Sequence, residues 1–138
     1  MKIHILKSDQ KEIENYKRIT VSDDQINLSE ISDNECSFIL ANDVLDSFSV
    51  ENIGSLITSI IKKLRIKGAV VIGGTDIRLF SNNVINGTIS GENAAKIIGS
   101  LRSMTTLNDT QNIIKSLGLN IDSTQISGIH YEIKATRG

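Results

Sequence analysis

Apolar and polar residues follow one another along this chain in patterns that separate strands from helices. Residues 3–6 and 69–72 are short apolar runs that predict strands, and the run at 37–41 suits a parallel strand buried on both faces. Residues 18–21 are rich in β-branched side chains, and residues 25–31 alternate between polar and apolar, so each segment predicts one more strand. The pattern therefore predicts a sheet with several parallel strands.

The clearest helical pattern lies between two of these strands. From Val50 to Leu64, apolar residues recur at steps of three and four, which is the period of a helix with one buried face. Ser49 is a suitable N-cap, the basic residues at 62–67 suit the negative end of the helix dipole, and Gly68 is expected to end the helix. Strand, helix and strand together predict a βαβ unit with parallel strands and a right-handed crossover.

Two further helices are predicted in the second half of the chain. Residues 81–90 read as a polar loop, and Ser90 is then expected to cap a short helix. Thr106 and Asp109 have the spacing of a capping box for another helix, which Gly118 is expected to end.

The C-terminal segment predicts a hairpin. Residues 119–125 and 129–135 flank the turn pair Ser127-Gly128, and apolar residues alternate with polar ones along the second arm. Tyr131 and His130 are therefore expected on opposite faces of this arm. The whole pattern predicts one α/β domain over residues 1–138, with a mostly parallel twisted sheet, helices on its faces and a C-terminal antiparallel hairpin.

Composition limits the classes of partner. The chain has 138 residues and a net charge of -1, so nothing in its overall charge predicts binding to nucleic acid or to an anionic membrane. Its longest apolar runs are too short to cross a bilayer, and its first residues lack the apolar core of a signal peptide. The basic cluster at 62–67 is expected to be a solvated helix end.

Few residues can supply metal or thiol chemistry. Cys36 is the only cysteine, which rules out an internal disulfide or a cluster of thiolate ligands, and it is expected to be a buried, inert thiol. A cytoplasmic location follows as the expectation. The two histidines, His4 and His130, leave little material for a metal site, so none is predicted.

Three segments carry a likeness to a known family through their order and spacing. They are DNECSFILANDVLDSF at 33–48, KKLRIKGAVVIGGTDI at 62–77 and NIIKSLGLNIDSTQISGIHYEIKATR at 112–137. Together they resemble the C-terminal half of a class I S-adenosylmethionine-dependent methyltransferase, and the resemblance covers roughly three-quarters of the chain. It implies a Rossmann-like fold, S-adenosylmethionine as cofactor and transfer of its methyl group.

The likeness weakens toward the N-terminus. The family follows its first strand with a glycine-rich turn, because a Cβ there would collide with the cofactor. At this place the chain has Lys7-Ser8-Asp9-Gln10, which contains no glycine. The resemblance then implies either a diverged cofactor loop, with Asp9 near the methionine amino group, or an ordinary polar turn.

Further cofactor contacts are implied at the ends of two strands. Asp23 and Asp24 follow the second strand, where the family places an acid that binds the ribose hydroxyls, although an Asp-Asp pair is also common in turns. Asn42 and Asp43 follow the strand at 37–41, and ligands in open α/β sheets bind beyond such strand ends.

Asp43 is the candidate catalytic residue, and it could orient the methyl acceptor or act as a general base. The alternative is that Asp43 and Asp46 simply cap the following helix. Residues 73–76 open onto the same rim, either to admit a ligand or as a plain exit from the strand.

Three functions remain open on the sequence. The first is a small, diverged methyltransferase that binds S-adenosylmethionine through the residues above. The second is a non-catalytic module of the same fold, which acts in assembly or regulation through a protein partner or as a homo-oligomer. The third is an unrelated α/β domain with another small ligand at the same rim.

Overall fold

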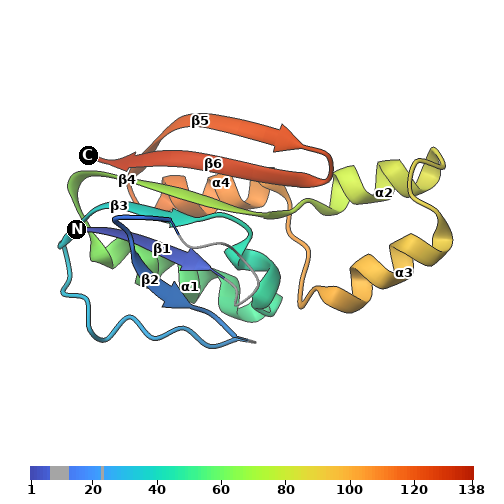
Figure 1. Cartoon of the computed structure of the whole chain (residues 1–138). Helices are drawn as coiled ribbons and strands as arrows, with labels where there is room; N and C mark the ends of the chain where they lie inside the picture. Colours follow the sequence, from blue (N-terminus) through green and yellow to red (C-terminus); the bar gives the residue numbers. More distant parts are fainter. Residues whose placement is uncertain (7–12, 23) are drawn as a thin grey trace.

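The computed structural model describes residues 1–6, 13–22 and 24–138, and these residues build one six-stranded mixed sheet with the order β2-β1-β3-β4-β6-β5 (Figure 1). Neighbouring strands among β1 to β4 are parallel, whereas β6 is antiparallel to both β4 and β5. The strands are β1 (Lys2–Leu6), β2 (Lys17–Thr20), β3 (Cys36–Ala41), β4 (Leu64–Thr75), β5 (Leu119–Ser127) and β6 (His130–Arg137). The predicted α/β fold is confirmed.

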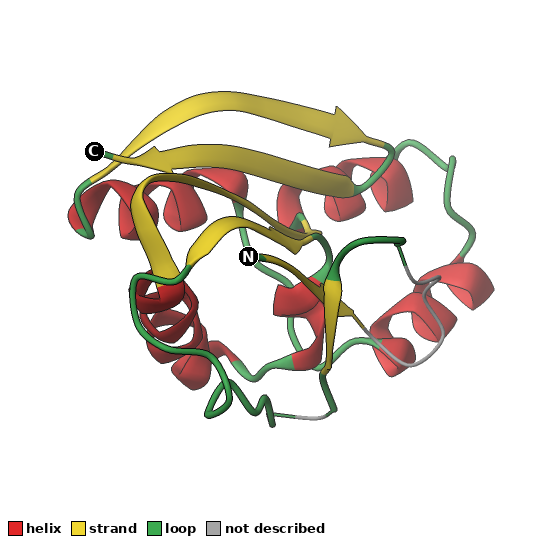
Figure 2. Ribbon diagram, turned by 60° about the vertical axis from the view of Figure 1, so that its left-hand side comes forward, coloured by secondary structure: helices red, strands yellow, loops and turns green. Residues whose placement is uncertain are grey.

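The helices occupy two places around the sheet. The helical elements are the 3₁₀ turn η1 (Val44–Ser47), α1 (Val50–Lys63), α2 (Ile77–Ile85), α3 (Gly91–Ser100) and α4 (Leu107–Ser116). Helices α1 and α4 contact each other and pack on one face of the sheet, against β4 and against β5 and β6 respectively (Figure 2). Helices α2 and α3 extend past the end at which the parallel strands finish (Figure 1).

The core lies between the sheet and the pair α1 and α4. Side chains from alternate strand positions meet one apolar face of each helix there, and nearly all of them are aliphatic. Fully buried members include Ile3, Ile5, Ile39, Val70, Ile72, Ile133, Ile57, Ile60 and Ile114. Tyr131 and Phe48 are the aromatic members, and the hydroxyl of Tyr131 contacts the hydroxyls of Thr105 (2.5 Å) and Thr110 (2.7 Å). This contact ties α4 to the sheet.

The opposite face of the sheet carries a row of half-buried apolar side chains: Phe38 and Leu40 on β3, and Ala69 and Val71 on β4. The ring of Tyr16 meets Phe38 edge-on, with 6.2 Å between the ring centroids. This row lies on the face away from α1 and α4.

Most of the predicted elements are confirmed with small shifts at their ends. The run at 37–41 is the parallel strand β3, and the helix after Ser49 is α1. Thr106 accepts a hydrogen bond from the N–H of Asp109, as the capping spacing predicts. Tyr131 is buried while His130 is exposed, so the faces of the hairpin are also as predicted.

The prediction of a strand at 25–31 is wrong. Apart from an isolated bridge between Ser22 and Gln25, the segment pairs with no strand. It is instead a loop that buries Leu28 and Ile31 against the core. The polar and apolar alternation reflects this one-sided packing rather than a place in the sheet.

The prediction of a polar loop at 81–90 is also wrong for its first half. Helix α2 begins after Asp76, because the carboxylate of Asp76 caps its first turn by accepting from the N–H groups of Arg78 (2.7 Å) and Leu79 (3.0 Å). The helix then continues to Ile85. Phe80 is the one residue of α2 that is buried. The second half of α2 includes Ser81, Asn82 and Asn83, residue types that favour turns over helix interiors, so the segment reads as a loop.

Gly68 does not end α1, contrary to expectation. The helix stops at Lys63 and the chain enters β4 directly at Leu64. Gly68 is required for another reason: a Cβ there would lie 2.8 Å from the backbone oxygen of Arg65 and 2.9 Å from that of Cys36. Within the described ranges, no helix is long and apolar enough to cross a membrane.

The pairing of β4 with β6 yields a testable prediction about Gly73. A Cβ at this residue would lie 2.2 Å from the backbone oxygen of Tyr131, so Gly73→Ala must push the two strands apart. We expect a loss of about 3 kcal/mol in the free energy of unfolding, measured by urea denaturation. Gly54→Ala is the matched control, because Gly54 is an exposed helical residue with nothing within 4 Å of its added Cβ. It should raise stability by about 0.5–1 kcal/mol, and equal effects of the two substitutions would contradict the prediction.

Candidate functional site

Polar side chains from separate elements gather where the parallel strands end. Asn42 and Asp43 directly follow β3, Thr75 is the last residue of β4, and the antiparallel strand β6 begins at the same edge with His130. The register pairs Thr75 with His130. This carboxyl-terminal edge is the place where open α/β sheets bind their ligands.

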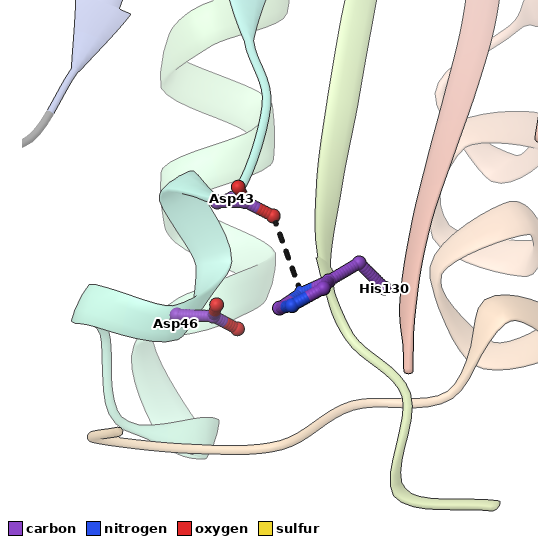
Figure 3. A group of neighbouring side chains, drawn as sticks. All are labelled: Asp43, Asp46 and His130. Carbon is purple, nitrogen blue, oxygen red and sulfur yellow. Dashed lines mark ion pairs between the residues drawn. The ribbon is translucent and has the colours of Figure 1, made fainter. Parts of the chain in front are cut away.

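Asp43 lies in the turn between β3 and η1 with a left-handed backbone (φ 61°). Although it occupies the N-cap position of η1, its side chain makes no capping hydrogen bond. Its Oδ1 lies 3.7 Å from Nδ1 of His130, and about a third of its side chain is exposed (Figure 3). The capping alternative therefore does not describe Asp43.

Asp46 is buried one turn later, at 4% exposure. Its carboxylate accepts from the N–H of Thr75 (2.8 Å) and from the Thr75 hydroxyl (3.0 Å). The Thr75 oxygen is also 3.4 Å from Nδ1 of His130. A chain of contacts thus runs from a buried carboxylate through Thr75 to the imidazole.

The sequence placed Thr75 in the segment 73–76 that opens onto the rim, but it gave neither Thr75 nor His130 a role of its own. The sequence contains only part of this information. The alternation along the hairpin predicts that His130 faces away from the core, but it does not indicate which strand lies beside β6. Once β6 pairs antiparallel with β4, the first residue of one strand stands next to the last residue of the other.

Asp43, Asp46 and His130 form a group that could hold a metal ion, since one ligand atom from each lies within 4.8 Å of the others. Two carboxylates and an imidazole suit several divalent transition metals. The three residues come from the loop after β3, from η1 and from β6, so their spacing in the sequence does not reveal the group. The expectation of no metal site stays a prediction.

A pocket of about 260 Å³ opens beside this group. It is lined by Asp43, Gln125, Ser127, His130, Tyr131 and Glu132. Its wall therefore combines an imidazole with two carboxylates, an amide and a hydroxyl, which suits a small polar molecule.

Two buried polar atoms have no hydrogen-bond partner in the described structure: Nδ1 of His4, in the middle of β1, and Oδ1 of Asn42, directly after β3. Burial lowers the pKa of His4, while the neighbouring Asn42 side chain acts in the opposite direction. His4 is 5% exposed, so its surroundings disfavour the charged imidazole. Unsatisfied buried atoms are rare, and a polar ligand at this edge would give them partners.

Asp24 accepts hydrogen bonds that join the loop after β2 to the start of α1 and to the segment after α3. Its Oδ1 accepts from the N–H (2.7 Å) and the hydroxyl (2.8 Å) of Ser49 and from the Asn52 amide (3.1 Å), and its Oδ2 accepts from Arg102. These donors, above all the Ser49 N–H, hold the pKa of Asp24 well below its usual range. Ser49 occupies the N-cap position of α1 but its side chain makes no capping hydrogen bond there.

The remaining predicted positions separate into three groups. Asp9 and Asp23, together with the turn Lys7-Ser8-Asp9-Gln10, lie outside the described residues, so their predicted cofactor contacts stay predictions. Gly73 makes its close approach to the neighbouring strand. Cys36 is buried, and burial raises the pKa of its thiol, as expected for an inert cysteine.

Comparison with known proteins gives a likeness in structure but not in sequence. No family model and no curated protein sequence matches the chain. A methyltransferase from Methanosarcina mazei that depends on S-adenosylmethionine superposes with a TM-score of 0.61 at 10% identity, over 99% of this chain and 82% of its own. One from Archaeoglobus fulgidus gives 0.59 at 12% identity, over 89% and 68%. Magnesium protoporphyrin IX methyltransferase from Synechocystis, solved with bound S-adenosylhomocysteine, gives 0.54 at 14% identity, over 89% and 51%.

These values establish the fold alone. The chain spans from about half to about four-fifths of the length of the three methyltransferases. The predicted Rossmann-like, methyltransferase-type fold is thereby confirmed.

The low pKa of Asp24 predicts how stability depends on pH. A carboxyl group whose pKa is lower in the folded than in the unfolded state contributes stability that is present above its ordinary pKa of about 3.9 and is lost as the pH falls below it. We expect the free energy of unfolding to fall with pH through this range, and to fall less steeply in Asp24→Asn. Urea denaturation from pH 7 to pH 3 measures both slopes. Glu92→Gln, an exposed substitution on α3, is the control and should change stability by less than about 0.5 kcal/mol. Equal slopes in wild type and Asp24→Asn would contradict the assignment.

Proposed function

We propose that this chain is a small, diverged methyltransferase domain that binds S-adenosylmethionine at the carboxyl-terminal edge of its sheet. The observation that supports this most is the gathering of Asn42, Asp43 and His130 at the strand ends of a methyltransferase-type fold. The same edge carries a pocket with room for a small acceptor.

The residues at the edge fit a polar cofactor unevenly. Asn42 fits, because its buried Oδ1 has no partner in the described structure and can accept from a donor on the ligand. Asp24 already accepts four hydrogen bonds from the protein, so we assign it first to holding the edge, and a ribose contact only second. Asp9 and Asp23 remain proposed contacts.

The bound cofactor would supply an electrophilic methyl group on a sulfonium. The protein's own work is then to place an acceptor in line with that methyl group and to keep the acceptor nucleophilic. Asp43 and His130 line the pocket in which the acceptor would lie, and both can hold a proton or orient one.

Cofactor binding is tested directly by calorimetry and by thermal unfolding with S-adenosylmethionine and S-adenosylhomocysteine. A ligand that binds only the folded state stabilises it, by about 2.7 kcal/mol when its concentration is 100 times its Kd. We expect both compounds to raise the melting temperature, and Asn42→Leu, which removes the amide, to weaken binding about tenfold or more.

Glu92→Gln is again the control, because it lies on α3 away from the strand ends, and it should bind as wild type does. No stabilisation by millimolar amounts of either compound would overturn the proposal. Equal affinity of Asn42→Leu and wild type would remove Asn42 from the site.

A second function is favoured by one observation, the half-buried apolar row of Phe38, Leu40, Ala69 and Val71 on the face away from α1 and α4. We propose as the alternative a non-catalytic module that self-associates through this face. Burial of such a row against a second copy is favourable by roughly 25 cal/mol per Å² of apolar surface.

Light scattering over a range of concentrations tests this alternative. A self-associating chain should double its mass as its concentration rises, and Leu40→Gln should shift that transition to concentrations about tenfold higher or more, because it places an amide in the apolar row. Circular dichroism confirms that the variant folds. A strictly monomeric wild type at millimolar concentration would contradict self-association.

A further inference from the structure

The contact chain that ends at His130 determines which imidazole nitrogen carries a proton. The Asp46 carboxylate accepts from the Thr75 hydroxyl over 3.0 Å. A carboxylate only accepts hydrogen bonds, so the single hydroxyl proton of Thr75 is committed to Asp46. The Thr75 oxygen therefore presents a lone pair to Nδ1 of His130, 3.4 Å away.

A lone pair facing Nδ1 requires a proton on that nitrogen. Asp43 acts in the same direction, since its Oδ1 lies 3.7 Å from the same atom (Figure 3). In a neutral imidazole, a proton on Nδ1 leaves the free lone pair on Nε2. His130 is thus held as the tautomer in which Nε2 is the basic atom.

The surroundings of the ring are rich in acidic side chains. Asp43 and Asp46 lie on one side of it, Glu132 lines the same pocket, and none of the described residues that line the pocket is a lysine or an arginine. Half of the His130 side chain is exposed, so a small molecule in the pocket can reach it. These are the features of a general base: a fixed tautomer, access and a partner for the charge that forms.

We propose that His130 is the catalytic base that takes the proton from the methyl acceptor, and that the acceptor is a small molecule with an ionisable O–H or N–H group. The inference rests on the proposed methyl transfer. Nε2 accepts the proton, and the electron pair left on the acceptor oxygen or nitrogen forms the bond to the methyl carbon. The methyl–sulfur bond breaks at the same time, and its electron pair goes to sulfur. Asp43 and Thr75 are positioning residues, which act through Nδ1.

The tautomer can be measured without any methyl transfer. The chain contains two histidines, so the ¹⁵N–¹H correlation spectrum of the imidazoles shows two sets of signals, and His130→Gln assigns them. We expect the shifts of the Nδ1–H form for His130 at neutral pH. Thr75→Val should yield a mixture of tautomers, and Thr75→Ser, which keeps the hydroxyl, should restore the wild-type pattern.

Transfer is then measured from methyl-labelled S-adenosylmethionine to three probes: a phenol, a primary alcohol and a primary amine. At saturating cofactor, His130→Gln should slow transfer to the preferred probe about 100-fold or more, the usual contribution of a general base.

The outcomes separate this inference from the proposed function. A wild type that fails to bind S-adenosylmethionine overturns both, and calorimetry shows it. A wild type that binds but has a proton on Nε2, or a His130→Gln variant with an undiminished rate, overturns the role of His130 alone. Selective broadening of the His130 signals by micromolar Mn²⁺ would also overturn it, because it would assign Asp43, Asp46 and His130 to a metal ion.

Discussion

The hydrogen bonds between the buried Asp46 carboxylate and Thr75 join the turn after β3 to the end of β4. A carboxylate in this position is tolerated only because donors meet it, so the two strand ends cannot separate without exposing an uncompensated buried charge. The backbone oxygen of Asp46 also accepts from the N–H of Arg102, which ties the segment after α3 to the same turn. The hydrogen bonds to Asp46 also fix the position of the Thr75 oxygen, which is the atom that faces Nδ1 of His130.

Asp24 supplies a second tie of the same kind. It links the loop after β2 to the first turn of α1 through Ser49 and Asn52, and to Arg102 beyond α3. The carboxyl-terminal edge is thus held by two acids that face inward to protein donors, while Asp43 faces the pocket. The three aspartates at this edge have the same residue type, but they differ in the donors that surround them and therefore differ in their roles.

Sequence reasoning succeeded where burial is one-sided and the period is strong. The run at 37–41, the helix after Ser49 and the C-terminal hairpin each bury a continuous apolar face, so the pattern alone predicts them. It failed at 25–31, where apolar residues pack from a loop, and at 81–90, where a helix buries little more than Phe80. Of the site, Asn42 and Asp43 were predicted because they follow a strand directly. Thr75 and His130 were not grouped, because their proximity depends on the register of β4 with β6, which no local pattern encodes.

The described residues at this edge are distributed unequally between the two partners of the proposed methyl transfer. Every described element that lines the pocket comes from the second half of the sheet or from the turn after β3, which is the side that would hold an acceptor. On the cofactor side, the described residues offer mainly Asn42 and His4, whose buried atoms are still without partners. A general base contributes about 10²–10⁴ to a rate, whereas correct placement of two reactants contributes far more. The acceptor side alone therefore cannot make this fold an efficient catalyst, and the affinity of the strand ends for the methyl donor decides whether the His130 pocket is used for transfer at all.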